Sequence, residues 1–148
     1  MADIFERILL LKDTAVFEHV TTDDLRNVAK ELDEQLLQKG DQIFSIDELG
    51  DHMYLIISGE IGITLGSDMP IHNDQYIAIF KSGDCFGEMG LLDDKPRSAS
   101  AYALEDSKVL TLGKQRLHGL IEHYPQLAVG MLRSLSLRLR TMNKRSGG

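Results

Sequence analysis

The chain has 148 residues, of which 43% are hydrophobic and 26% are charged. The length predicts a single domain over residues 1–148 and leaves little room for a second one, and the composition is typical of a globular domain with a core. The one cysteine excludes an internal disulfide, and the longest apolar run, Met53 to Ile57, is far too short for a membrane span. Because the N-terminus also lacks the pattern of a signal peptide, we expect a cytoplasmic protein.

The formal net charge of −7 is unevenly distributed along the chain. No acidic residue follows position 132, and the basic residues there are Arg133, Arg138, Arg140, Lys144 and Arg145. The rest of the chain is therefore strongly acidic. This argues against nucleic acid as the main partner, because phosphate contacts need clustered Lys and Arg.

Residues 1–33 are predicted to form helices. Apolar side chains recur at roughly helical spacing between residues 3 and 11. Thr21 followed three residues later by Asp24 is typical of a helix start, since both side chains can bond exposed backbone N–H groups. The apolar face of this second helix is formed by Leu25, Val28, Ala29 and Leu32.

Residues 34–112 show a different pattern, in which short β-prone runs alternate with turns rich in Gly and Asp. Short strands at regular spacing predict a sandwich or barrel. The predicted strands are Glu34 to Gln38, Gln42 to Ser45, Met53 to Ser58, Ile61 to Leu65, Tyr76 to Phe80, Ser98 to Leu104 and Lys108 to Leu112.

Residues 114–143 are again predicted to be helical. The first of these helices covers Lys114 to His123, and Pro125 suits the first position of the next one, where its missing N–H costs nothing. The last helix has apolar side chains at i, i+3, i+4 and i+7 spacing, namely Ala128, Met131, Leu132, Leu135, Leu139 and Met142.

The segment FGEMGLLDDKPRSASA, residues 86–101, has the chemistry of an anion-binding loop. Gly87 and Gly90 allow the backbone to approach a ligand closely, and N–H groups at the start of a helical turn attract anions. The guanidinium of Arg97 can hold two phosphate oxygens, while Glu88 can accept a hydrogen bond from a ribose hydroxyl. The residue types alone leave a second interpretation open, in which Glu88 and Arg97 form a surface salt bridge in an ordinary turn.

This segment closely resembles the phosphate-binding cassette of the cyclic-nucleotide-binding domain family. That family includes bacterial catabolite-activator-type regulators, regulatory subunits of cAMP-dependent kinase, and cyclic-nucleotide-gated channels. KGDQIF (residues 39–44) and GDHMYLIISGEIGI (residues 50–63) resemble its early strands. The matching cassette positions are Phe86, Gly87, Glu88, Met89, Gly90, Leu91, Arg97, Ser98 and Ala99.

The resemblance implies a mainly β fold, an antiparallel β-roll or jelly roll (double-stranded β-helix), with helices before and after it. It also implies that Arg97 pairs with the cyclic phosphate and that Glu88 accepts from the ribose 2′-hydroxyl. Backbone or hydroxyl contacts would come from the other ligand-binding residues, which are Phe86, Gly87, Met89, Gly90, Ser98 and Ala99. Asp47 stands where the family often has glycine, at a turn away from the cassette, so we expect only a local change there.

Enzyme and metal chemistry are not expected. The five histidines are dispersed, and neither Cys85 nor any serine is paired with a histidine at the spacing of a nucleophile. We expect Cys85 to be a packing residue, no metal site, and no cofactor other than the ligand, cAMP or cGMP.

The predicted function is that of a regulatory sensor, in which ligand binding moves the last helix and so signals to an unidentified effector. The basic last helix has three interpretations: a solvated face with favourable charge at its C-terminal end, a lid or homodimer helix, and a contact with an anionic membrane or DNA, which is the least expected. The alternative function is an interaction or scaffold module that keeps the fold without binding nucleotide.

Overall fold

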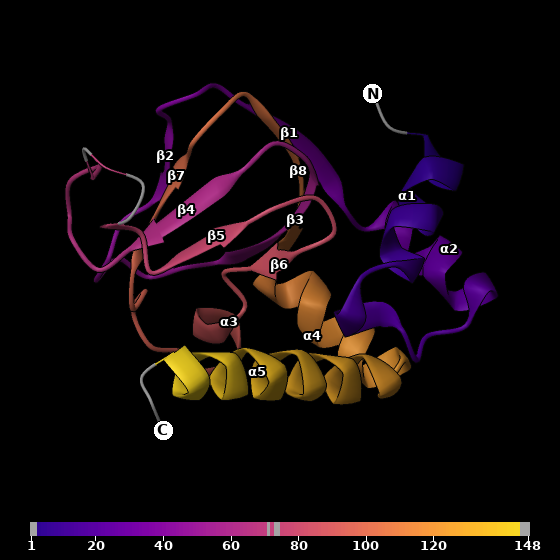
Figure 1. The fold of residues 1–148 in the computed structure, drawn as a ribbon. Coiled ribbons are helices and arrows are strands. Elements are labelled where there is room, and N and C mark those ends of the chain that lie inside the picture. The colour runs from indigo at the N-terminus through magenta and orange to yellow at the C-terminus, as the bar shows by residue number, and fades with distance from the viewer. Residues whose placement is uncertain (1–2, 71, 73–74, 146–148) are drawn as a thin grey trace. The chain divides into compact units, whose positions relative to one another are not determined.

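The computed structural model describes residues 3–70, 72 and 75–145, with side chains up to Asn143. The chain divides into two compact units. Residues 32–114 form the first, which we call the β unit, and residues 2–31 with 115–148 form the second, which we call the helical unit (Figure 1). The expectation of one domain over residues 1–148 stays a prediction.

The β unit consists of two antiparallel four-stranded sheets, with strand orders β1-β8-β3-β6 and β2-β7-β4-β5 (Figure 1). The strands are β1 Asp33–Leu37, β2 Gln42–Phe44, β3 His52–Ser58, β4 Ile61–Thr64, β5 Ala78–Phe80, β6 Cys85–Phe86, β7 Ser100–Ala103 and β8 Ser107–Gly113. The mainly β, antiparallel fold class with helices before and after it in the chain is confirmed.

Alternation along the strands builds the core of the β unit. In β4, Ile61 and Ile63 contribute to the core, while Gly62 between them is covered by the ring of Tyr76. Residues of both sheets join one apolar cluster, which comprises Leu37, Phe44, Ile56, Ile61, Ile63, Phe86, Ala101, Ala103 and Val109. The two sheets therefore share a single core, as expected when every second side chain of a strand points to the same face.

The observed strands differ from the predicted ones at the cassette. Strand β6 was not predicted, although Cys85 and Phe86 pair with Leu55 and Tyr54 of β3. A run of two residues is too short to show any periodicity. Strand β7 begins two residues later than predicted, because the chain from the short helix α3, Met89–Asp93, to Ser100 is irregular.

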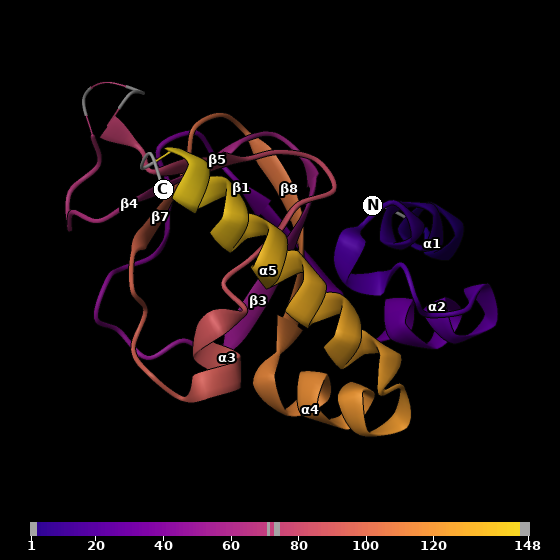
Figure 2. The same ribbon diagram turned by 60° about the horizontal axis from the view of Figure 1, so that its bottom comes forward.

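The helical unit contains α1 Ile4–Lys12, the 3₁₀ helix η1 Ala15–Phe17, α2 Thr22–Lys30, α4 Lys114–His123 and α5 Gln126–Arg145, although Lys114 itself belongs to the β unit. The side chain of Thr21 accepts a hydrogen bond from the N–H of Asp24 at 3.3 Å, which confirms the predicted helix start. Helix α5 begins one residue after Pro125 rather than at it. Helices α1 and α2 lie side by side (Figure 2).

Helix α5 crosses η1 at Gly130. A Cβ at this position would lie 1.9 Å from the carbonyl oxygen of Val16, so only glycine permits the observed approach. One turn later, Nη1 of Arg133 lies 2.8 Å from Nε2 of His19. The exposed apolar side chains of α5 include Leu132, Leu137, Leu139 and Met142, and the side chains of Lys144 and Arg145 in the predicted basic tail lie outside the described residues.

Candidate functional site

The two charged residues of the cassette are buried in the β unit. Arg97 is 6% exposed and Glu88 is 1% exposed. A charged side chain is rarely buried to this degree unless it is paired or has a function. The interpretation of Glu88 and Arg97 as a surface salt bridge is therefore wrong.

The guanidinium of Arg97 is held by groups from three parts of the chain. Nη1 donates to the carbonyl oxygen of Gly87 at 2.5 Å, and Nη2 donates to the carbonyl oxygen of His52 at 2.7 Å. The carbon Cζ lies 4.1 Å from the centroid of the Phe44 ring. Nε is buried and has no hydrogen-bond partner among the described residues. The protein's own carbonyls thus accept from two of the five N–H groups of the guanidinium that was expected to hold phosphate, and the buried Nε–H is left unsatisfied.

Two glycines make room for this side chain. A Cβ on Gly50 would lie 2.2 Å from both Cζ and Nε of Arg97, so the guanidinium keeps its position only beside a glycine. Gly87 has a φ of +81°, and a Cβ there would lie 3.1 Å from Nη1 of Arg97. Gly87 therefore meets two requirements that favour glycine, a left-handed backbone and a close contact.

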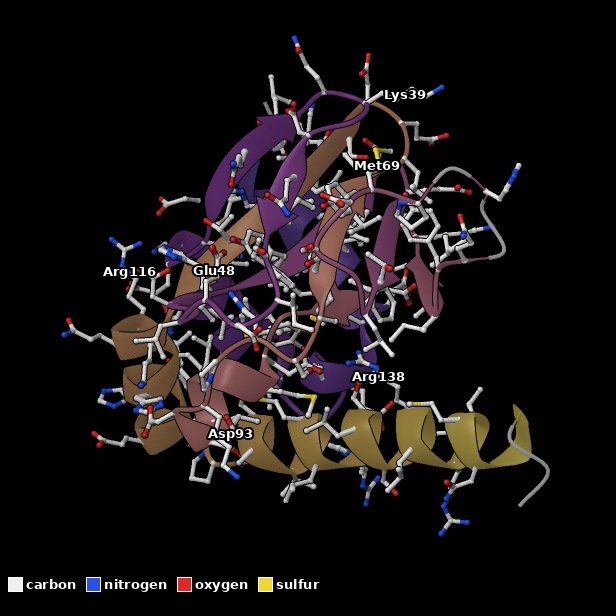
Figure 3. All side chains as sticks on the ribbon, turned by 90° about the vertical axis from the view of Figure 1, so that its left-hand side faces the viewer. Lys39, Glu48, Met69, Asp93, Arg116 and Arg138 are labelled. Carbon is white, nitrogen blue, oxygen red and sulfur yellow. The ribbon has the colours of Figure 1, made fainter. Side chains whose placement is uncertain are left out.

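The loop between β2 and β3 is bonded to the main chain of Arg97. The N–H of Asp47 donates to the carbonyl oxygen of Arg97 at 2.9 Å, and the N–H of Arg97 donates to that of Glu48 at 2.8 Å. Asp47 has a φ of +74°. The expectation that this turn lies away from the cassette is wrong, because these two hydrogen bonds join the turn to Arg97. In Figure 3, the label Glu48 marks this loop, and the labels Lys39 and Asp93 mark opposite ends of the β unit.

Burial and nearby charges act on Arg97 in opposite directions. Burial lowers the pKa of the guanidinium, while Tyr54, Glu48, Asp51 and Glu88 raise it. Since the reference pKa of arginine is so high, the side chain remains a cation at neutral pH. The site therefore presents a permanent, partly desolvated positive charge.

The remaining predicted site residues occupy different environments. Phe86 is a core residue whose ring stacks on Tyr54 with 5.0 Å between the centroids. Gly90 is buried, and Ala99 packs against the apolar core. Met89 and Ser98 are exposed. Gly87 is bonded to the side chain of Arg97 through its carbonyl oxygen.

Three residues around Arg97 were missed by sequence reasoning: Phe44, Gly50 and His52. Phe44 and Gly50 lie within segments that resemble the family's early strands, but this resemblance indicates only the fold and assigns neither residue to the site. The contribution of His52 is its main-chain carbonyl, which no residue type can reveal.

The helical unit contains a pocket lined by other residues. Its volume is about 360 Å³, and its lining residues are Asn27, Glu31, Arg116, Gly119, Leu120, His123 and Tyr124. None of the predicted site residues contributes to it. Within the described part of the chain, no His, Cys, Asp and Glu residues gather in a way that could hold a metal ion, and no helix is long and apolar enough to cross a membrane.

Comparison with known proteins gives a consistent picture. Residues 34–124 match the model of the family described as the cyclic nucleotide-binding domain. The CRP-like cAMP-activated global transcriptional regulator of Mycobacterium tuberculosis is 28% identical over 134 residues, which are 90% of this chain and 59% of the relative. The cAMP-dependent protein kinase regulatory subunit of Hypocrea atroviridis is 35% identical over 115 residues, which are 76% of this chain and 23% of the relative.

The fold agrees with this match. The crystal structure of the Thermus thermophilus catabolite activator protein superposes with a TM-score of 0.78 and 30% identity, over 90% of this chain and 62% of that chain. The chain spans 59% of the length of the bacterial regulator and less of the kinase subunit. The buried arginine, the glycines around it and the family match over residues 34–124 together show that the chain belongs to the cyclic nucleotide-binding domain family.

Proposed function

We propose that this chain is a regulatory domain that binds cAMP through residues 86–101, with Arg97 as the phosphate-binding residue. The observation that carries the proposal is the buried guanidinium whose Nε has no partner among the described residues. A buried, unsatisfied donor is costly, by roughly 1–3 kcal/mol, and such groups are concentrated at functional sites. A phosphate oxygen would satisfy Nε and neutralise the charge.

The other contacts are those that the resemblance to the family implies. Glu88 accepts a hydrogen bond from the ribose 2′-hydroxyl, since an ionised carboxylate is only an acceptor. Gly87, Met89 and Gly90 supply main-chain contacts near the start of α3, and Ser98 and Ala99 contact the phosphate. Phe86 acts indirectly, because its ring lies in the core and supports the start of the segment. The relatives named for cAMP support this ligand over cGMP.

The approach of a phosphate would change the surroundings of Arg97. Each Nη atom already donates one N–H to a carbonyl oxygen, of Gly87 or of His52, and carries a second N–H. Nε is buried, so a phosphate that reaches it must displace part of the chain around the guanidinium, and a phosphate that takes the N–H groups bonded to residues 87 and 52 releases those carbonyls. The regulatory output then passes to α5, which changes position or pairs with a second copy, and on to an effector protein or domain. This is a two-state element whose populations the ligand shifts.

Isothermal titration with cAMP, cGMP and 5′-AMP tests the proposal. We expect cAMP to bind more tightly than the other two, and Arg97→Ala to weaken binding by at least roughly 2 kcal/mol through the loss of charge-assisted hydrogen bonds. Arg26→Ala is the matched control, since Arg26 is an exposed arginine of α2. Absence of heat with either cyclic nucleotide up to millimolar concentration would exclude the function, and an unchanged affinity of Arg97→Ala would exclude the role of Arg97.

A second candidate is an interaction module that uses Arg97 only as a structural cross-link. It is favoured by the two carbonyls that already occupy the Nη atoms. Under this alternative, Arg97→Lys lowers the free energy of unfolding while the wild-type protein shows no nucleotide binding. Denaturant unfolding of both proteins, with and without cAMP, separates the two candidates.

A further inference from the structure

Phe44 lies directly against the guanidinium of Arg97, although it belongs to a different part of the chain. It is the last residue of β2, and its ring centroid is 4.1 Å from Cζ of Arg97. Both side chains are buried, with 7% of Phe44 and 6% of Arg97 exposed. A cation this close to a ring face is attracted by the ring's quadrupole, and removal from water strengthens the attraction.

An irregularity in the sheet places the ring there. Gln42 pairs with Tyr102, but Phe44 pairs with Ala101, so β2 contains one extra residue relative to β7. In a regular strand, residues 42 and 44 would face the same side. The bulge changes this: Nε2 of Gln42 donates to the hydroxyl of Tyr102 at 3.0 Å, whereas Phe44 joins the apolar core with Ala101. Bulges re-aim side chains in this way beside functional sites.

The ring also packs against two other aromatic side chains. Its centroid lies 6.0 Å from that of Tyr54 and 6.1 Å from that of Phe86. Phe86 opens the cassette, so the ring joins the segment that would bind the ligand to the arginine that would bind its phosphate. A ring confined by two neighbours has few rotamers available, and it therefore offers the guanidinium a fixed surface.

We propose that Phe44 is a positioning residue for Arg97, which holds the guanidinium over its ring and thereby sets the affinity for the ligand's phosphate. The inference rests on the proposed function. The proposed role of Phe44 requires an aromatic ring, because an aliphatic side chain of similar size fills the core but has no quadrupole to attract the cation.

The binding test compares three variants by titration with cAMP. We expect Phe44→Leu to weaken binding about tenfold, which corresponds to a desolvated cation–π contact of about 1.4 kcal/mol. We expect Phe44→Tyr, which keeps an aromatic ring, to bind cAMP with wild-type affinity. Phe80→Leu is the control, because it removes a ring from the same aromatic cluster: the ring centroids of Phe80 and Phe86 lie 5.9 Å apart. Wild-type affinity in Phe44→Leu, or an equal loss in Phe80→Leu at equal stability, would overturn the proposal.

A second measurement does not depend on ligand. In the wild-type protein, ring current from Phe44 should shift the Nε–H resonance of Arg97 upfield in a nitrogen–proton correlation spectrum, and Phe44→Leu should abolish this shift. An unshifted wild-type resonance would overturn the stacking whatever the protein binds. Failure of the wild-type protein to bind cAMP would instead overturn the proposed function, so the two failures are distinguishable.

Discussion

The β unit and the helical unit both depend on glycines, but for different partners. In the β unit, Gly50 makes room for the guanidinium of Arg97, a charged side chain. In the helical unit, Gly130 makes room for the carbonyl oxygen of Val16, a main-chain group where α5 crosses η1. A missing Cβ admits a buried charge in one unit and a helix crossing in the other. We therefore expect substitutions to affect ligand binding in the first unit and stability in the second.

Gly50→Ala should show the largest effect. The new methyl group would occupy the space of Cζ and Nε of Arg97, so the guanidinium must leave its position. We expect cAMP binding to weaken by roughly 2–3 kcal/mol, the combined scale of overpacking and of a lost charge-assisted hydrogen bond. Titration calorimetry measures this.

The control for this change is Gly66→Ala. A Cβ at Gly66 would meet its nearest atom at 3.8 Å, which is ordinary van der Waals contact. If Gly66→Ala weakens binding as much as Gly50→Ala does, the effect is a general one of the β unit and the comparison fails.

Gly130→Ala should instead act on stability. The contact with the carbonyl oxygen of Val16 cannot be relieved by rotating a side chain, so α5 and η1 must separate. We expect the free energy of unfolding to fall by about 2 kcal/mol, measured by urea denaturation.

Gly119→Ala in α4 is the matched variant, because no atom lies within 4 Å of a Cβ built there. It should be stabilising by roughly 0.5–1 kcal/mol through helix propensity. Destabilisation by both variants would contradict the assignment of the Gly130 effect to the crossing.

Asp47 tests how far the β unit tolerates backbone strain beside Arg97. Its φ of +74° is accessible to Asp, Asn and Gly but costly for a β-branched residue. We expect Asp47→Val to lower the free energy of unfolding by about 1–2 kcal/mol, and Asp47→Asn to change it by less than about 0.5 kcal/mol. Thermal unfolding of both variants measures the difference, and equal effects would show that the left-handed backbone is not the cause.

The smallest effect should come from the exposed rim of the site. A hydrogen bond with His52, 2.7 Å long, lowers the pKa of Asp51 below its usual value. A carboxyl with a depressed folded-state pKa contributes stability above its unfolded pKa, about 3.9, and loses it as the pH falls further. The wild-type protein should therefore lose slightly more stability than Asp51→Asn between about pH 5 and pH 3.

His52→Gln provides the partner variant for this titration. It removes the imidazole but keeps the main-chain carbonyl that accepts from Arg97. Its pH dependence should match that of Asp51→Asn, and a wild-type profile would show that the imidazole does not cause the shift.

Sequence reasoning succeeded where the determinants are local. The helix of residues 114–123 and the start at Thr21 follow from periodicity and capping, and both appear in the structure. Arg97 and Glu88 stood out because the glycines and the charges lie within one short segment. The burial of these two charges was not foreseeable, since it depends on how two sheets enclose the segment.

What escaped prediction depends on contacts between distant parts of the chain. The bulge that turns Phe44 toward Arg97 arises from the pairing of β2 with β7, which no pattern within residues 42–44 reveals. The turn at Asp47 was placed away from the cassette because a sequence shows no main-chain hydrogen bonds across 50 residues. A motif points to the candidate residue Arg97, while the residues that hold its side chain come from other parts of the chain.

The burial of Tyr54 near the charge of Arg97 has an optical consequence. The chain contains four tyrosines and no tryptophan, so phenol absorption is not masked by indole. Burial raises the pKa of Tyr54, and the charge of Arg97 acts to lower it. A ligand that neutralises Arg97 would therefore delay the ionisation of this phenol. Alkaline titration followed by phenolate absorbance could then report occupancy of the site without any added label.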